Sequence, residues 1–121
     1  MARILIADDS NTQVQYLRQI LTPLGHEILV ASDGEDAEAK CLEQRPDLVI
    51  LDIVMPKRNG FQVTRAIRQH PGLQTMPILV VTSMSRDSDR YWGLKQGANA
   101  YLNKPFDPQV LVSTVQKLLA G

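Results

Sequence analysis

The chain has 121 residues, 44% of them hydrophobic, and its 13 basic and 13 acidic side chains cancel. That length and hydrophobic content suit one domain with a packed core, and the balanced charge gives no electrostatic reason to expect binding to nucleic acid or to an anionic membrane. No apolar run approaches the roughly 20 residues that a membrane-spanning helix needs, so we expect no membrane insertion.

Strand-like and helix-like segments alternate along the chain. In order, we predict strand 3–7, helix 11–23, strand 27–31, helix 35–44, strand 48–51, helix 61–70, strand 78–82, helix 86–96, strand 99–102 and helix 108–119. Ser10 is suited to cap the first helix, Gly25 to end it, and Pro108 to occupy the first turn of the last helix. This alternation predicts an α/β fold, a doubly wound five-stranded parallel sheet with helices on both faces.

The sequence shows no repeat, low-complexity tract or interdomain linker, and the last predicted helix nearly reaches the end of the chain. We therefore expect a single domain over residues 1–121, without an output domain. The first strand begins almost at once, which leaves no room for a signal peptide, and the single cysteine, Cys41, has no partner for an internal disulfide. These features favour a cytoplasmic location.

Four of the predicted strands end in polar residues. They are Asp8 and Asp9 after the first strand, Asp52 after the third, Thr82 at the end of the fourth, and Lys104 after the fifth. The carboxyl ends of parallel strands share one edge of a sheet, and ligands of open α/β sheets bind in the crevice there. We therefore expect these side chains to meet in one pocket.

The three carboxylates of this group predict a metal site. Two unit charges 4 Å apart repel by about 4 kcal/mol at an effective dielectric constant near 20. Mg²⁺ relieves such repulsion, because it binds a few carboxylates and often shares phosphate oxygens. We predict that Asp8, Asp9 and Asp52 hold Mg²⁺. The alternative is that the first two only cap a turn and a helix, and that Asp52 only opens a loop.

A hydroxyl and an ammonium at neighbouring strand ends suit an anion with several oxygens, such as a phosphoryl group. Thr82 would donate a hydrogen bond to it and Lys104 would supply charge. Alternatively, Thr82 caps the following helix and Lys104 is an ordinary surface lysine. The first strand lacks the glycines of a nucleotide-binding loop, and neither His26 nor His70 belongs to a zinc-type spacing.

Together, these motifs resemble the receiver domain of two-component response regulators, of the chemotaxis-regulator type, over nearly the whole chain. The matching pieces are Asp8-Asp9-Ser10, Asp52-Ile53-Val54-Met55-Pro56 with Gly60 eight residues after the aspartate, Thr82-Ser83, and Lys104-Pro105-Phe106. The resemblance implies a flavodoxin-like fold with strand order 2-1-3-4-5.

The resemblance also implies roles for the acidic residues. Asp52 would accept a phosphoryl group from the phosphohistidine of a histidine kinase. Asp8 and Asp9 would hold Mg²⁺ together with Asp52 and the backbone carbonyl of Val54. The protein would catalyse only its own phosphorylation and dephosphorylation, and would not be a turnover enzyme.

A switch is implied as well. Thr82 and Lys104 would bind the phosphoryl oxygens, and Tyr101 falls where the family has its switch aromatic. In that scheme Thr82 moves toward the phosphate and Tyr101 turns inward. The binding of a downstream protein target then changes on the face formed by helix 86–96, strand 99–102 and helix 108–119.

Two apolar positions bear on how long the phosphate lasts. Val54 and Met84 stand two residues after Asp52 and Thr82, where polar side chains can help to orient a hydrolytic water. We therefore expect slow self-dephosphorylation.

A second resemblance concerns the pathway. The run Tyr91-Trp92-Gly93, with Gln96-Gly97-Ala98 and Tyr101-Leu102, is similar to stand-alone regulators of type IV pilus twitching or phototactic motility. Alternatively, Trp92 only packs on helix 86–96.

Two other functions compete with the switch. A phosphorelay intermediate or phosphate sink would use the same site without changing partner binding. A haloacid-dehalogenase-type phosphatase also has an aspartate nucleophile at a strand end, but it needs a second aspartate two residues later, where this chain has Val54.

Overall fold

Five strands alternate with five α-helices in the computed structural model, which describes residues 1–121. The strands are β1 (Arg3–Ala7), β2 (Glu27–Ala31), β3 (Leu48–Leu51), β4 (Ile78–Thr82) and β5 (Ala100–Asn103). The helices are α1 (Asn11–Leu21), α2 (Gly34–Gln44), α3 (Gly60–Gln69), α4 (Asp87–Gln96) and α5 (Pro108–Leu119), with a short 3-10 helix η1 (Thr22–Leu24). All ten predicted elements are present, each with bounds within two residues of those expected.

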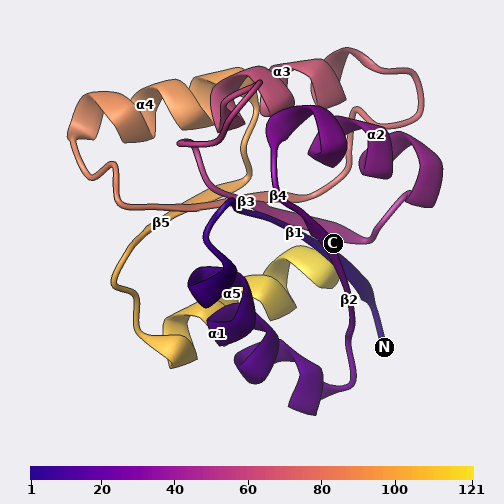
Figure 1. Ribbon diagram of the computed structural model, residues 1–121, viewed down its shortest axis with the longest axis vertical. Helices are drawn as coiled ribbons and strands as arrows, with labels where there is room; N and C mark the ends of the chain where they lie inside the picture. The colour runs from indigo at the N-terminus through magenta and orange to yellow at the C-terminus, as the bar shows by residue number, and fades with distance from the viewer.

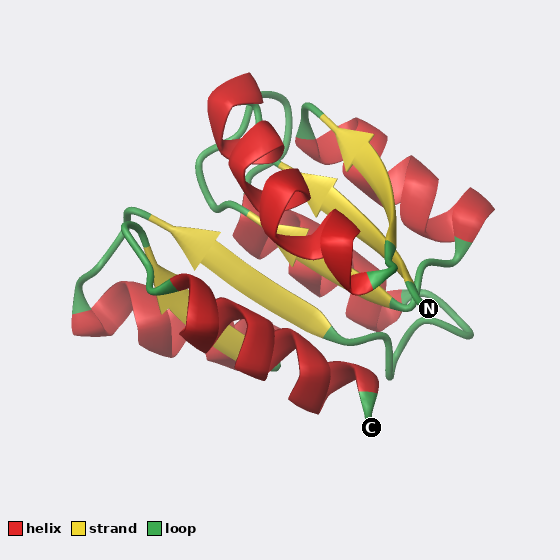
Figure 2. Cartoon of the chain, turned by 90° about the horizontal axis from the view of Figure 1, so that it is seen from below, coloured by secondary structure: helices red, strands yellow, loops and turns green.

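The strands form one parallel sheet in the order β2-β1-β3-β4-β5. Figure 2 shows the strand arrows running in a common direction. Every residue of β3 and β4 is buried, which is the pattern of strands covered by helices on both faces. The doubly wound α/β fold and the strand order 2-1-3-4-5 are therefore confirmed.

Helices cover both faces of the sheet. In Figure 1, α2, α3 and α4 lie above the sheet, and α1 and α5 lie below it. Side chains along a strand alternate between the two faces, so Leu5 packs in the core beneath α2–α4, whereas Ile4 and Ile6 pack against α1 and α5. The strand backbone is thus fixed from both sides. The residues just beyond the strand ends are therefore also held in place.

The first helix ends earlier than its apolar pattern predicts. The α-helix stops at Leu21, and Thr22–Leu24 continues as a 3-10 turn. Pro23 explains the difference, because proline has no backbone N–H to extend the α-helical ladder. Gly25 then takes a left-handed conformation, with φ of 89°, which suits its predicted role as a helix stop.

Helix α4 differs from the others because it has almost no buried apolar stripe. Its buried residues are Asp89 and Gly93, while Tyr91, Trp92 and Leu94 are exposed. The alternative that Trp92 is a packing residue is not favoured, since about half of its surface, 52%, is exposed. None of the helices combines the length and the hydrophobicity that crossing a bilayer requires.

Cys41 gives a test of the core beneath α2. Its side chain is fully buried, and burial, with a smaller contribution from the charge of Glu38, raises the pKa of the thiol to about 12. We expect a thiol reagent to react with the native protein about a hundredfold more slowly than with the denatured chain. Similar rates in the two states would contradict the packing described here.

The same thiol predicts a pH dependence. The pKa of Cys41 is higher in the folded state than its ordinary value of 9.0. Its contribution to stability is therefore fully present below pH 9 and is lost as the pH rises toward 12, because the unfolded chain ionises first. Replacing Cys41 with Ser removes this thiol, so comparing the two proteins by denaturant unfolding across that pH range measures the effect.

Candidate functional site

Asp8, Asp52 and Lys104 meet at the carboxyl edge of the sheet. Lys104 Nζ lies 2.9 Å from Asp8 Oδ2 and 3.0 Å from Asp52 Oδ2. The sheet brings the two aspartates together, because β1 and β3 are neighbours with Ala7 opposite Leu51, and the residues after them therefore lie side by side. The sequence expectation of convergence is met for these three residues.

Backbone amides hold the other oxygen of each carboxylate. Asp8 Oδ1 accepts a hydrogen bond from the N–H of Ser10 at 2.9 Å. Asp52 Oδ1 accepts from the N–H groups of Ile53 at 2.6 Å and Val54 at 3.3 Å. Only 3% of Asp8 and 8% of Asp52 is exposed, so both carboxylates are nearly buried and fixed in orientation. Their Oδ2 atoms are left facing Lys104.

The ammonium of Lys104 compensates the repulsion between the two buried acids. Since both Oδ2 atoms lie within 3.0 Å of one nitrogen, they are at most about 6 Å apart, where two charges repel by about 3 kcal/mol at an effective dielectric constant of 20. Burial works against the charged lysine, but the hydrogen bonds and charges of Asp8 and Asp52 outweigh it and raise the pKa of Lys104. The sequence predicts that Lys104 binds a phosphoryl group, but it does not predict the ion pairs of Lys104 with Asp8 and Asp52.

The structure does not bring all three predicted metal ligands into one cluster. Asp9 is exposed and its carboxylate accepts no hydrogen bond, and no three Asp, Glu, His or Cys side chains are arranged to hold a metal ion. The physical reason is that Asp8 and Asp52 orient their Oδ2 atoms toward Lys104. The structure thus shows a two-carboxylate pair bridged by an ammonium, with Asp9 outside it, and the assignment of all three carboxylates to Mg²⁺ stays a prediction.

The donor set nevertheless fits Mg²⁺. The candidate ligands, which are the carboxylates of Asp8, Asp9 and Asp52 and the carbonyl of Val54, are all oxygen donors, the ligand type that this hard cation prefers. The Asp9 carboxylate is free, and the backbone carbonyl of Val54 accepts no hydrogen bond. Three carboxylates against one ammonium also leave an excess of two negative charges, which one divalent cation balances.

Thr82 and Tyr101 lie on the neighbouring strands. Thr82 ends β4 and is fully buried, and its hydroxyl accepts a long hydrogen bond of 3.4 Å from the N–H of Met84. Its carbonyl accepts from the N–H of Lys104 at 2.8 Å, which ties the lysine-bearing segment to β4. Tyr101 is only 1% exposed, and its hydroxyl donates to the carbonyl of Met84 at 2.6 Å.

Tyr101 is therefore already inward in this structure. Burial, and then the charges of Asp89 and Asp52, raise the pKa of its phenol, and the nearby charge of Arg90 opposes them in part. The inward ring position is the one that the resemblance to receivers assigns to the switched form.

Gly60 shows why a glycine stands eight residues after Asp52. It begins α3, and its N–H donates to the carbonyl of Ile53 at 2.8 Å. A Cβ atom there would lie 2.3 Å from the backbone oxygen of Asp52. Any larger residue would push the Asp52 segment out of place, so the glycine permits the close approach that positions the carboxylate.

The sequence reasoning missed several residues around Tyr101. Arg90 donates a hydrogen bond to the Tyr101 backbone carbonyl, and Gly93 lies against the Tyr101 ring. Asn103 donates a hydrogen bond to the carbonyl of Met84, which also accepts the Tyr101 hydroxyl. Only one signal pointed to any of them: Asn103 is two residues after Tyr101, so the two side chains lie on the same face of a strand. The other contacts depend on how α4 packs, which no local pattern reveals.

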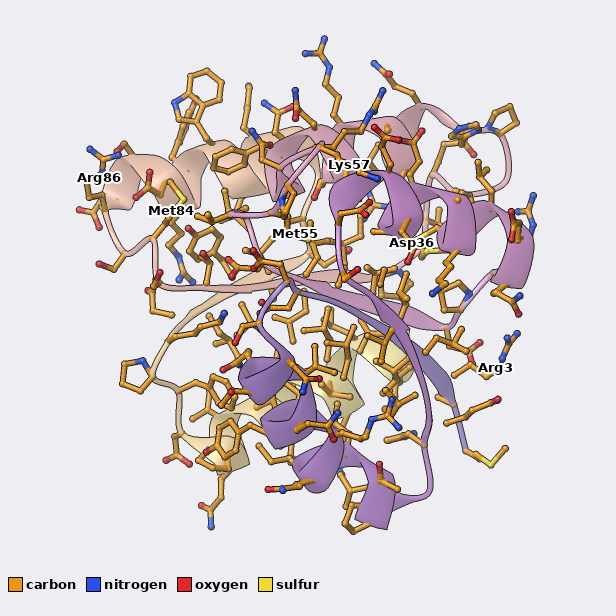
Figure 3. The ribbon with its side chains drawn as sticks, in the orientation of Figure 1. Arg3, Asp36, Met55, Lys57, Met84 and Arg86 are labelled. Carbon is orange, nitrogen blue, oxygen red and sulfur yellow. The ribbon has the colours of Figure 1, made fainter.

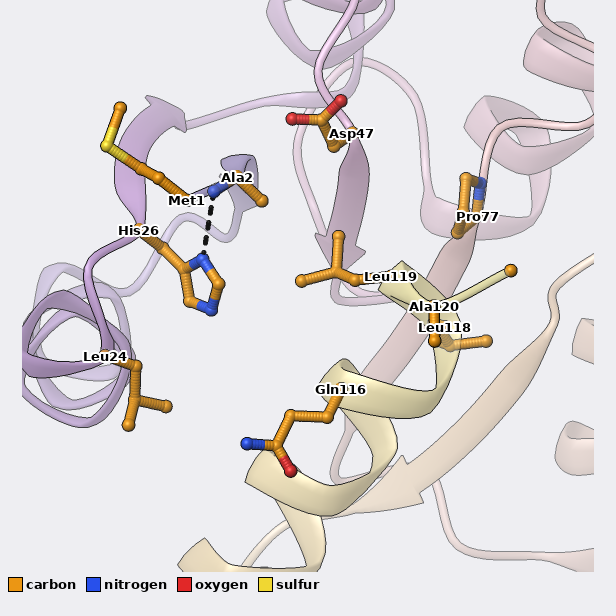
Figure 4. Close-up of a pocket in the computed structure, with 11 residues that line it drawn as sticks. Met1, Ala2, Leu24, His26, Asp47, Pro77, Gln116, Leu118, Leu119 and Ala120 are labelled. Carbon is orange, nitrogen blue, oxygen red and sulfur yellow. Dashed lines mark hydrogen bonds between the residues drawn. The ribbon is translucent and has the colours of Figure 1, made fainter.

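The largest hollow of the molecule, about 750 Å³, lies at the opposite edge of the sheet (Figure 4). Ala2, Asp47 and Pro77, which line it, precede β1, β3 and β4, whereas the acidic residues follow the strands. The hollow and the acidic pair are therefore separate features. Two buried aspartates and the lysine that bridges them lie at the carboxyl edge, so we take that edge as the functional site.

Comparison with known proteins identifies the class. The model of the response regulator receiver domain matches residues 4–116. The chain is 43% identical to protein PilH of Pseudomonas aeruginosa over 121 residues, which is 100% of both chains. It also superposes on the crystal structure of a putative response regulator from Chloroflexus aurantiacus with a TM-score of 0.95, at 38% identity, covering 99% of this chain and 98% of that one.

A further solved structure is the receiver domain of sensor histidine kinase PA1611 from Pseudomonas aeruginosa, with a magnesium ion coordinated in its active site cleft. The TM-score is 0.92 at 28% identity, covering 99% of this chain and 98% of that chain. The protein belongs to the response regulator receiver domain family, and its fold is the flavodoxin-like fold of that family. Its class is thus the phosphorylation-type switch of two-component systems.

Replacing Lys104 tests the ion-pair bridge. In Lys104→Met, two nearly buried carboxylates lose their only cation, so we expect a loss of about 3 kcal/mol in the free energy of unfolding without metal. Adding Mg²⁺ should restore part of it, because the cation replaces the lost charge. Urea unfolding with and without Mg²⁺ measures both effects.

Lys117→Met is the matched control, since Lys117 is exposed on α5 and forms no ion pair. Its effect should stay within about 0.5 kcal/mol. The pKa of Lys104 is raised in the folded state, so the stability difference between the wild type and Lys104→Met should also depend on pH. It should be fully present below the ordinary lysine pKa of 10.5 and be lost as the pH rises through the raised pKa of Lys104. Equal stability of Lys104→Met and Lys117→Met would contradict the bridge.

Proposed function

We propose that a histidine kinase phosphorylates this receiver on Asp52 and that the modified protein binds a downstream protein target differently. The observation that carries the proposal is the 3.0 Å contact between Asp52 Oδ2 and Lys104 Nζ, beside the buried carboxylate of Asp8. Asp52 Oδ1 is occupied by two backbone amides, so Oδ2 is the oxygen that faces the charged side of the site. We assign Oδ2 as the nucleophile.

The reaction is a group transfer between two side chains. The Asp52 Oδ2–phosphorus bond forms as the bond between phosphorus and the kinase imidazole nitrogen breaks, and that nitrogen keeps the bonding electron pair. Such transfers depend mainly on positioning and on charge stabilisation. The two amides fix the carboxylate, and Lys104 is placed to move from the Asp8–Asp52 pair onto the phosphoryl oxygens.

Mg²⁺, held by Asp8, Asp9, Asp52 and the Val54 carbonyl, would supply the remaining positive charge for the phosphoryl oxygens. The magnesium ion in the PA1611 receiver domain supports this assignment. Thr82, fully buried at the end of β4, has a hydroxyl whose hydrogen can be donated to a phosphoryl oxygen, because in this structure the hydroxyl only accepts. Residues of this chain therefore provide the nucleophile and two contacts to the transferred group.

The output belongs to the face formed by α4, β5 and α5 in this proposal. Tyr101 of β5 packs against α4, where a Cβ on Gly93 would come within 2.9 Å of its ring. Displacement of Thr82 or Tyr101 therefore reaches α4 directly. We propose protein partners alone, a kinase and a target, with no nucleic acid. The full-length similarity to PilH supports a motility or chemotaxis-type pathway in the cytoplasm.

Two alternatives use the same residues. A phosphorelay intermediate or phosphate sink would be phosphorylated equally well but would not change its affinity for any target, so binding measured with and without phosphate separates it. An aspartate-nucleophile phosphatase needs an acid two residues after Asp52, and Val54 cannot serve. We propose that the protein catalyses only its own phosphorylation and dephosphorylation.

The central experiment is incubation with Mg²⁺ and acetyl phosphate, followed by intact mass. We expect the wild type to gain the mass of one phosphoryl group and Asp52→Asn to gain none, because the amide is not a nucleophile. Asp9→Asn should react more slowly and need more Mg²⁺. A phosphoryl group on Asp52→Asn, or none on the wild type, would overturn the assignment.

Val54 predicts the lifetime of the phosphorylated form. Its side chain, 59% exposed, stands two residues after Asp52 and offers no polar group to orient an attacking water. We expect slow loss of phosphate, and an increase of about tenfold in the hydrolysis rate for Val54→Asn. Val110→Asn, at a valine that is 47% exposed on α5, is the matched control and should leave the rate unchanged.

Release of phosphate from purified phosphoprotein, followed by intact mass over time, gives these rates. Rapid hydrolysis in the wild type, or equal rates in Val54→Asn and Val110→Asn, would contradict the role given to position 54.

A further inference from the structure

One backbone carbonyl receives two side chains of β5. The carbonyl of Met84, on the segment between β4 and α4, accepts a hydrogen bond from Tyr101 Oη at 2.6 Å and from Asn103 Nδ2 at 2.9 Å. In Figure 3, Met84 lies on this segment just before Arg86 at the start of α4. A carbonyl oxygen has two lone pairs, so both donors bind it at the same time.

Tyr101 and Asn103 reach that carbonyl together because of strand geometry. They are two residues apart in β5 and therefore point to the same face of the sheet. The Asn103 amide also lies 3.5 Å from the carbonyl of Thr82, which accepts the N–H of Lys104 at 2.8 Å. The end of β5 is thus joined to the Thr82–Met84 segment by several hydrogen bonds. The one from the Asn103 amide fixes the Met84 carbonyl independently of Tyr101.

The inward position of Tyr101 depends on that carbonyl and on Gly93. The ring is buried, and a Cβ at Gly93 would lie 2.9 Å from its Cδ2 and Cε2 atoms. The phenolic hydroxyl, in contrast, has a single protein partner, the Met84 carbonyl. A buried hydroxyl without a partner is costly, so the inward ring is stable only while this acceptor stays in place.

We propose that Asn103 is a positioning residue for the switch: its amide holds the Met84 carbonyl as the acceptor for the Tyr101 hydroxyl, and so sets how far Tyr101 stays inward. This role rests on the proposed phosphorylation switch, which it deepens. When Thr82 moves toward a phosphoryl group, the Thr82–Met84 segment moves against the Asn103 contact. Asn103 therefore links events at Asp52 to the packing of α4.

Three variants test the role. Asn103→Leu keeps a similar volume but removes the donor, and Tyr101→Phe removes the other donor to the same carbonyl. Asn103→Ala removes the donor without adding a charge beside the phenol, and is used in the same way if Leu lowers stability too far. The matched control is Asn99→Leu. The side-chain oxygen of Asn99 accepts hydrogen bonds from Arg68 and Ile78, but Asn99 immediately precedes β5, at the opposite end of the strand from Asn103.

The first measurement is the ultraviolet titration of the phenols in the unphosphorylated protein. The other two tyrosines, Tyr16 and Tyr91, are exposed, and subtracting the Tyr101→Phe titration isolates Tyr101. We expect Asn103→Leu to lower the ionisation midpoint of Tyr101 by about half a pH unit, an increase of about threefold in its ionisation constant. Asn99→Leu should lower stability without moving this midpoint.

The second measurement is a double-mutant cycle on unfolding, with the phosphorylation response beside it. Since both donors share one acceptor, the effects of Asn103→Leu and Tyr101→Phe should be non-additive. Trp92 is the single tryptophan and lies on α4, so its emission reports on that helix. In Asn103→Leu, acetyl phosphate should phosphorylate Asp52 to the wild-type extent, while the accompanying change in Trp92 emission is reduced at least twofold.

An unchanged Tyr101 midpoint in Asn103→Leu and Asn103→Ala, together with additive unfolding effects, would overturn the role of Asn103. Equal shifts in Asn103→Leu and Asn99→Leu would overturn it as well, because they would show a general structural effect. Failure of the proposed function is distinguishable, since it appears as absence of phosphorylation in the wild type. The titration and the cycle use unmodified protein and are decided independently of that result.

Discussion

The site is organised around one cation shared by two buried acids. Lys104 Nζ lies within 3.0 Å of carboxylate oxygens from both Asp8 and Asp52, which follow two different strands, β1 and β3. Neither carboxylate can move into water without breaking backbone hydrogen bonds, so the ammonium is what makes their burial tolerable. In the proposed function, the same charge would become available to an incoming phosphoryl group once Mg²⁺ is bound to the acids.

The sheet supplies the precision that this arrangement needs. Central strands buried on both faces leave no freedom at their ends, and Gly60 allows α3 to begin against the backbone of Asp52. By contrast, α4 contributes little apolar surface to the core and exposes Tyr91 and Trp92. The molecule therefore combines a rigid acidic edge with a loosely anchored helix, and Tyr101 lies between them. In the proposed function, that contrast would let a local change of charge at Asp52 reach the surface that binds the target.

Much of this was predictable from the sequence because it depends on periodicity. Buried strands have a recognisable length and composition, so the ends of β1, β3 and β5, and hence the meeting of Asp8, Asp52 and Lys104, followed from the pattern alone. The early end of α1 required attention to Pro23, and the pairing of Lys104 with both acids required side-chain geometry. The exposed position of Asp9 and the environment of Tyr101, built from Gly93, Asn103 and Met84, depend on tertiary packing that no local pattern encodes.

A crystal structure of the protein with Mg²⁺ and beryllium fluoride, a mimic of a phosphoryl group on a carboxylate, tests the central claim most directly. We expect beryllium bonded to the carboxylate of Asp52 and Lys104 Nζ moved onto a fluoride, with the metal ion against Asp9. A structure in which Lys104 still bridges Asp8 and Asp52 while the adduct forms on another residue would contradict it.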